Sequence, residues 1–318
     1  MPASQLPASP THVDSAKSAG SNKETSMKNT TLSHSALRST GTNETTTSQM
    51  VNRHLNAQCM DCTVVVDAAL LLAQAKPRSA DAVASATHIY TTLFNSKQLT
   101  EVSGDLQTLV EGQCTSEKAT YPGMRQLFDL IARAVYNEVV QLGPTDPVRQ
   151  ETRLLQSTSN FDYVATGSDN HNQPDMAVVA QAVPADDFPS VAAKEQWCNI
   201  ALVVEGKRDN TAASKGTEPS QASLDKARGQ LARYVLNLYT SQPNRRFAWA
   251  LITINTFVYV YLFGRDRALC TQPINLATLA GRQLFARFLI FWSLAGPAQF
   301  GLDPTIEYDA TTQHWAIT

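Results

Sequence analysis

Apolar residues recur at helical spacing in several parts of the chain. The clearest stretch begins at Tyr121-Pro122 and continues to Gly143-Pro144, with apolar residues about every 3.6 positions. Proline near its start and the Gly-Pro pair at its end are typical helix boundaries. The same spacing predicts further helices over residues 67–75, 79–94, 224–238 and 280–294.

Shorter apolar runs, rich in β-branched and aromatic residues, predict strands. The run over 197–207 is the most continuous, which is typical of a strand buried on both faces. The run over 247–263 contains Thr253, Asn255 and Thr256 and is shorter than a membrane span of about 20 residues. It therefore predicts a hairpin with strands over 247–254 and 259–263, and no contact with a membrane. Further strands are expected over 161–165, 176–183, 306–308 and 314–317, with a polar connection or short helix over 144–157.

The first part of the chain has a different composition from the rest. Residues 1–58 are dominated by Ser, Thr, Asn and Ala and contain few large apolar residues. Such a segment buries too little surface to offset the entropy lost on ordering, so it predicts a disordered tail. Residues 59–120 are expected to form a helical extension, and residues 121–318 an α/β domain.

Composition and charge exclude only a few classes of function. The 318 residues, 43% of them hydrophobic, are enough for a core, and a net charge of −2 gives no general affinity for nucleic acids. Five irregularly spaced cysteines favour a reducing compartment over a disulfide framework. No secretory signal is evident at the N-terminus. We therefore expect a soluble intracellular protein, cytoplasmic or nuclear.

Charged residues stand at the end of the most buried predicted strand. Glu205 and Lys207 are two residues apart and therefore point to the same face. Burying two unpaired charges costs several kcal/mol, so a partner is expected, such as a metal ion or an anionic substrate. Asp175 opens the preceding strand. Two carboxylates on neighbouring strands would form an oxygen site for Mg²⁺, which polarises a phosphate and activates water. The alternative is a structural salt-bridge cluster of these three residues.

Other polar residues are weaker candidates for a site. Gln230 and Tyr234 are four residues apart and share one face of a predicted helix. Arg245 and Arg246 precede a strand and could contact phosphates, although surface ion pairs would explain them equally well.

The order Pro174-Asp175, Glu205-x-Lys207 and Gln230-xxx-Tyr234 resembles the PD-(D/E)xK nuclease pattern in its RecB-like form. The resemblance implies a restriction-endonuclease-like αβββαβ core, a small mixed sheet flanked by helices. It also implies that Asp175 and Glu205 bind a divalent ion and that Lys207 orients the attacking water. Gln230 and Tyr234 would be supporting contacts near the nucleic acid, DNA or RNA. A helical glutamate often precedes the acidic strands in this superfamily, and Glu138 is the candidate.

The chain from about Tyr121 onwards also resembles the region before the kinase domain in fungal-type protein kinases. The resemblance implies a kinase domain or kinase polypeptide as partner. It rests on blocks at Pro174-Asp175, Trp197 with 204–207, 230–234, 242–247, 263–267 and 301–305.

The motifs needed for phosphotransfer are missing from these 318 residues. A Gly-rich loop, a strand lysine with a helix glutamate, a His-Arg-Asp loop and an Asp-Phe-Gly site would be required. The sequence thus leaves two main hypotheses open: a divalent-metal-dependent nuclease or nuclease-like binding domain, and a regulatory or interaction module without chemistry of its own.

Overall fold

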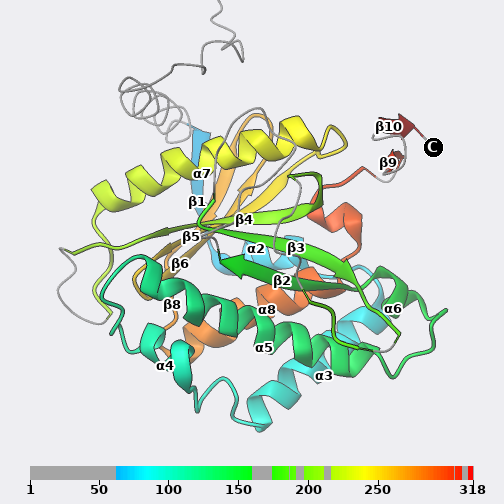
Figure 1. Cartoon of the computed structure of the whole chain (residues 1–318), viewed down its shortest axis with the longest axis horizontal. Helices are drawn as coiled ribbons and strands as arrows, with labels where there is room; N and C mark the ends of the chain where they lie inside the picture. Colours follow the sequence, from blue (N-terminus) through cyan, green and yellow to red (C-terminus); the bar gives the residue numbers. More distant parts are fainter. Residues whose placement is uncertain are drawn as a thin grey trace, which may run out of the picture. The chain divides into compact units, whose positions relative to one another are not determined.

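The computed structural model describes the backbone of residues 62–159, 174–185, 187–190, 197–210, 216–303, 305–309 and 314–317. The predicted tail at 1–58 and the predicted strand at 161–165 lie outside these residues. Within them, a mixed β-sheet has helices on both faces (Figure 1). Its strands are β1 (Thr63–Val66), β2 (Arg153–Ser159), β3 (Met176–Ala182), β4 (Ile200–Lys207), β5 (Ala248–Ile254), β6 (Phe257–Phe263), β7 (Ala268–Thr271) and β8 (Ile274–Asn275).

The strands run in the spatial order β1-β7-β6-β5-β4-β3-β2, and β8 also pairs with β6. Two pairs are parallel, β4 with β5 and β1 with β7, and the other pairs in this sheet are antiparallel. Every residue of β4 and β5 is buried, as expected for central strands covered on both faces. A separate antiparallel pair is formed by β9 (Ile306–Asp309) and β10 (His314–Ile317).

The helices cover the two faces of the sheet unequally. One face packs on α7, and apolar residues such as Val203, Ile252 and Leu231 form its core. The other face packs on several helices, including α5 and α8, and its core contains Leu202, Val204 and Phe285. The helices are α2 (Ala68–Ala75), α3 (Ala80–Asn95), α4 (Gly104–Val110), α5 (Tyr121–Val139), α6 (Pro147–Glu151), α7 (Gln221–Ser241) and α8 (Leu279–Leu294), with 3₁₀ turns at Lys118–Thr120, Trp197–Asn199 and Pro297–Phe300.

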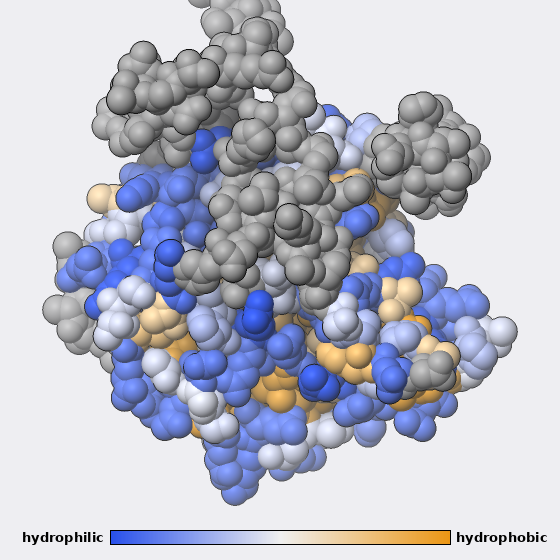
Figure 2. Space-filling model, viewed as in Figure 1, coloured by the Kyte–Doolittle hydropathy of each residue, from blue (hydrophilic) through white to orange (hydrophobic). Residues whose placement is uncertain are grey.

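Most of the predicted elements are confirmed. The side chains of Asp67 and Ser79 cap the starts of α2 and α3. The run over 247–263 forms the antiparallel strands β5 and β6, as predicted. Along the part of the chain that the structure describes, no helix is both long and apolar enough to cross a bilayer. On the face seen in Figure 2, hydrophilic residues cover most of the coloured surface and apolar residues appear in separated patches.

Two strands differ from the sequence prediction. The segment predicted as a polar connection or short helix contains α6 and also most of the strand β2, whose consecutive residues Leu154 and Leu155 are both buried. Strand β1 was not predicted, because four residues give little periodicity and Val64 and Val65 are exposed. It forms by pairing with β7, about 200 residues further along the chain.

Candidate functional site

The register of two strands brings the predicted acidic residues together. Strand β3 runs antiparallel to β4, with Met176 opposite Val204. Asp175 precedes Met176 and Glu205 follows Val204, so these two acids are neighbours. Lys207 follows on the same face of β4 as Glu205. This is the face that packs on α7, since Ala177 and Val203 belong to the same apolar core as that helix.

The ammonium group of Lys207 is surrounded by carboxylates. It forms an ion pair with Glu205, and its Nζ lies 3.6 Å from Oδ2 of Asp175. A third carboxylate, which sequence reasoning missed, comes from Glu117, with Oε1 3.4 Å from the same Nζ. Lys207 also donates a hydrogen bond of 2.7 Å to the carbonyl of Gly206. Only 10% of the Lys207 side chain and none of the Glu205 side chain is exposed, so water screens these charges little.

Gly206 and Tyr121 hold the cluster in place from the other face of β4. The backbone amide of Gly206 donates to Oδ2 of Asp175 at 2.8 Å. The Tyr121 hydroxyl, at the start of α5, donates to Oε1 of Glu117 at 3.1 Å. A Cβ atom at position 206 would lie 2.5 Å from the Tyr121 ring, which is far inside contact distance. Glycine between Glu205 and Lys207 is therefore needed for the tyrosine to approach the strand.

The charges of the cluster do not balance. Three carboxylates around one ammonium leave an excess of negative charge if all are ionised. Burial, followed by the charge of Asp175, raises the pKa of Glu205, and the opposing attraction of Lys207 is weaker. Burial alone would lower the pKa of Lys207, but Glu205, Asp175 and Glu117 together raise it. A site with this balance retains a proton or attracts a further cation.

The two predicted residues of α7 lie on the helix that faces the cluster. Tyr234 is buried, and burial, then Glu205, then Asp175 raise the pKa of its hydroxyl. Gln230 precedes it by one helical turn, and its buried Oε1 has no hydrogen-bond partner in the described structure. The charges of both carboxylates thus act on Tyr234, whereas no hydrogen bond joins Gln230 to them in the described part of the chain.

Glu138 does not belong to this cluster. It lies at the end of α5 opposite Tyr121, about 25 Å away along the helix at 1.5 Å per residue. Its carboxylate pairs instead with Nδ1 of His88, at 2.7 Å. The acid that approaches the cluster from this side is Glu117, which precedes α5. The turn before a helix gives no periodic signal that would have indicated Glu117, and Glu138 was predicted from the superfamily resemblance alone.

Arg245 and Arg246, predicted together as phosphate contacts, differ in their surroundings. Arg245 is buried, and its guanidinium donates to the side chain of Gln242 at 2.8 Å and to two backbone carbonyls. It is therefore not on the surface, where a nucleic-acid backbone would pass, and that part of the prediction is corrected. Arg246 is exposed.

The cluster has ligands suited to Mg²⁺ but few of them. No group of three or more His, Cys, Asp or Glu is arranged to hold a metal ion in the ranges that the structure describes. Asp175 and Glu205 supply two adjacent carboxylates. Oε1 of Glu205 is paired with the Lys207 ammonium, and its Oε2 is buried without a hydrogen-bond partner among the residues that the structure describes. Mg²⁺ commonly takes only one or two protein carboxylates and completes its shell with water and phosphate oxygens. The donor set is thus compatible with Mg²⁺.

Comparison with known proteins relates part of the chain to one family. Residues 173–318 match a protein-family model described as fungal protein kinase. The match covers less than half of the chain. It includes Asp175, Glu205 and Lys207 but excludes Glu117 and Tyr121. Comparisons with curated proteins and with solved structures gave no match.

Proposed function

We propose that residues 121–318 form a PD-(D/E)xK nuclease-like domain of a fungal-type protein kinase-like protein, with a divalent-metal-dependent site that binds or hydrolyses phosphodiesters. The observation that carries the proposal is the convergence of Asp175 and Glu205 on Lys207. Asp175 comes from one motif of the sequence and Glu205 and Lys207 from another, 30 residues later, and the three meet at the ends of β3 and β4. DNA or RNA would be the ligand of this site.

The order of the elements supports this assignment. From α5 onwards, the large sheet and its helices follow the chain as α5, β2, β3, β4, α7 and β5, with the short helix α6 before β2. Leaving α6 aside, this is the αβββαβ order of the superfamily. The acids lie at the expected places, with Asp175 immediately before β3 and Glu205 near the end of β4. The shared order supports the fold proposal, and function depends on the site itself.

Mg²⁺ would be held by Asp175 and Glu205, and when bound it would polarise the scissile phosphate and favour ionisation of a water molecule. The raised pKa of Lys207 keeps this side chain protonated at neutral pH. It therefore donates hydrogen bonds and stabilises negative charge, and it does not accept the proton of the attacking water. Glu117 and Tyr121 position Lys207. Because the pKa of Glu205 is raised, cation binding at this carboxyl would be favoured by higher pH.

The test is cleavage of labelled single- and double-stranded DNA and RNA with Mg²⁺ or with EDTA. We expect Mg²⁺-dependent cleavage that falls about 100-fold or more in Glu205→Gln and in Lys207→Ala, since each removes a charge that acts on the reacting phosphate. The matched control is Glu138→Gln, which removes a carboxylate outside the cluster. Full cleavage by Glu205→Gln would reject the assignment.

One observation favours the second hypothesis, a regulatory or interaction module without chemistry. The Lys207 ammonium already neutralises Glu205, and this carboxylate has no exposed surface. A buried ion cluster of this kind can be a purely structural feature, whose disruption destabilises the fold without affecting any ligand. Under this hypothesis the purified chain binds no Mg²⁺ and cleaves no nucleic acid, yet associates with a separate kinase polypeptide. Mg²⁺-dependent cleavage that is lost in Glu205→Gln would exclude it.

A further inference from the structure

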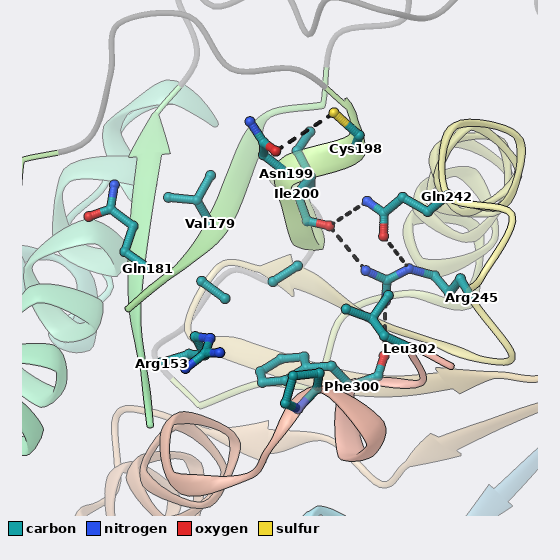
Figure 3. Close-up of a pocket in the computed structure, with 13 residues that line it drawn as sticks. Arg153, Val179, Gln181, Cys198, Asn199, Ile200, Gln242, Arg245, Phe300 and Leu302 are labelled. Atoms are coloured by element: carbon teal, nitrogen blue, oxygen red, sulfur yellow. Dashed lines mark hydrogen bonds between the residues drawn. The ribbon is translucent and has the colours of Figure 1, made fainter. Parts of the chain in front are cut away.

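A cavity lies at the opposite end of strands β3 and β4 from the carboxylate cluster. It has a volume of about 330 Å³ and is lined by residues at the start of β4, the end of β3 and the turn after α7. Ile200 in its wall and Glu205 in the carboxylate cluster are five residues apart on β4, which corresponds to about 17 Å. Exposed Asn199 at its margin connects it with the surface. Figure 3 shows the cavity and the side chains around it.

Two arginines on different walls give this cavity a positive charge. Arg245 follows α7, Arg153 begins β2, and no Asp or Glu is among the lining residues (Figure 3). Burial lowers the pKa of Arg153, and the charge of Glu151 opposes this with a smaller effect, but the two side chains do not form an ion pair. The two cations therefore face the cavity without a counter-ion from its walls.

The guanidinium of Arg245 is held rigidly without being neutralised. It donates to Oε1 of Gln242 at 2.8 Å, to the carbonyl of Phe300 at 3.0 Å and to the carbonyl of Ile200 at 3.1 Å. Gln242 is itself fixed by hydrogen bonds to the carbonyls of Trp197 and Ile200. All of these acceptors are uncharged. A fully buried cation without a carboxylate is costly, and the usual compensation is an anion.

Arg153 keeps part of its hydrogen-bonding capacity. Its Nη1 donates to the backbone carbonyls of Gln150 and Thr152, at 2.7 and 2.9 Å. Its Nε and Nη2 have no acceptor among the residues that the structure describes. These atoms form the edge of the guanidinium that binds carboxylate or phosphate oxygens in pairs.

The rest of the wall is apolar. Val179, Ile200, Phe300 and Leu302 lie around the arginines, together with small residues such as Ala180. Pockets for small molecules combine an apolar lining with a few polar groups that fix orientation, and this volume is at the lower end of their range. At about 30 Å³ for each water-sized group, the cavity accommodates roughly ten non-hydrogen atoms.

We infer that this cavity binds a small organic anion, in which a carboxylate or phosphate group lies between Arg153 and Arg245 and a short apolar chain or ring lies against Phe300 and Ile200. The site is separate from the carboxylate cluster and does not depend on the proposed nuclease function. Two blocks that carry the sequence resemblance, 242–247 and 301–305, meet beside this cavity, where the Arg246 amide donates to the Gly301 carbonyl and the Asp303 amide to the Asn244 carbonyl.

The experiment is titration calorimetry of the full chain with octanoate, which has about ten non-hydrogen atoms and thus fills the cavity. Octanol tests the need for charge, and inorganic phosphate tests the need for an apolar part. We expect saturable binding of octanoate, with octanol and phosphate each binding at least tenfold more weakly. Equal binding of octanol and octanoate, or no saturable binding of octanoate at millimolar concentration, would overturn the inference.

Substitutions in the cavity wall test whether octanoate binds in this cavity. Arg153→Gln removes one charge from the wall and should weaken octanoate binding about tenfold or more. Ala180→Leu keeps both charges but fills part of the volume, and it should have a similar effect even if Arg153→Gln does not fold. The matched control is Arg267→Gln, which removes an exposed arginine outside the cavity. Unchanged octanoate affinity in both cavity variants would show that the anion binds elsewhere and would reject the site.

Discussion

The two ends of strands β3 and β4 place buried cations in opposite surroundings. At one end, Lys207 is surrounded by the carboxylates of Asp175, Glu205 and Glu117, so every charge has an opposite charge beside it. At the other end, the Arg245 guanidinium contacts only neutral oxygens. The first arrangement has an excess of negative charge, and the second an excess of positive charge.

This difference shows that burial alone does not identify the ligand of a charged site. Lys207, the last residue of β4, and Arg245, three residues before β5, are both buried cations. The identity of their neighbours decides what each end attracts, a cation at the carboxylate cluster and an anion at the arginine cavity. Removing one charge at a time distinguishes these two cases.

The largest effect on stability is expected at the carboxylate cluster. Lys207→Met removes the cation that pairs with all three acids and should lower the free energy of unfolding by about 3–5 kcal/mol, as for other broken buried ion pairs. Urea denaturation measures this loss. The double variant Glu205→Gln/Lys207→Met removes the stranded charge as well and should recover part of the stability. A loss below about 1 kcal/mol in Lys207→Met would show that the ion cluster contributes little to folding.

A smaller effect is expected at the arginine cavity. Arg245→Met leaves the Phe300 carbonyl and Oε1 of Gln242 without their donor, which destabilises by about 1–3 kcal/mol, but it also removes an uncompensated charge. We therefore expect a net loss of roughly 2 kcal/mol or less, again measured by urea denaturation. A loss as large as that of Lys207→Met would contradict the proposed difference between the two ends.

The smallest effect is expected far from both sites. Glu138→Gln breaks the exposed pair with His88 and should change stability by less than about 1 kcal/mol. Its cleavage activity should equal that of the unchanged chain, because Glu138 lies at the far end of α5. A clear loss of activity in this variant would restore Glu138 as a residue of the site.

The sequence predicted the central part of the carboxylate cluster because its geometry is local. The alternation of side chains along a strand places Glu205 and Lys207 on one face, and the strand that begins after Asp175 was also recognisable. Most helices had clear caps and apolar periodicity, as in α3, which begins after Ser79. These signals act over a few residues and survive folding unchanged.

The remaining features depend on contacts that are distant in sequence. Glu117 joins Lys207 across 90 residues, and the turn that carries it has no distinctive pattern. Arg245 and Arg246 are adjacent and chemically identical, yet one is buried and one exposed, because the 3₁₀ turn Pro297–Phe300 and the start of β4 both contact the guanidinium of Arg245. The pairing of β1 with β7 likewise requires the folded sheet.

The pairing of β1 with β7 also sets a limit on how the family-matched segment can be isolated. A fragment starting at residue 173 would lack β1 and β2, so both β7 and β3 would become open edges of the sheet. It would also lose α3 and α5, which pack on α8, and would expose the apolar side of that helix to solvent. Open edges and bared apolar surface promote aggregation. Soluble expression of the matched segment is therefore expected to require the preceding chain from about residue 62, supplied in the same polypeptide or as a complementing fragment.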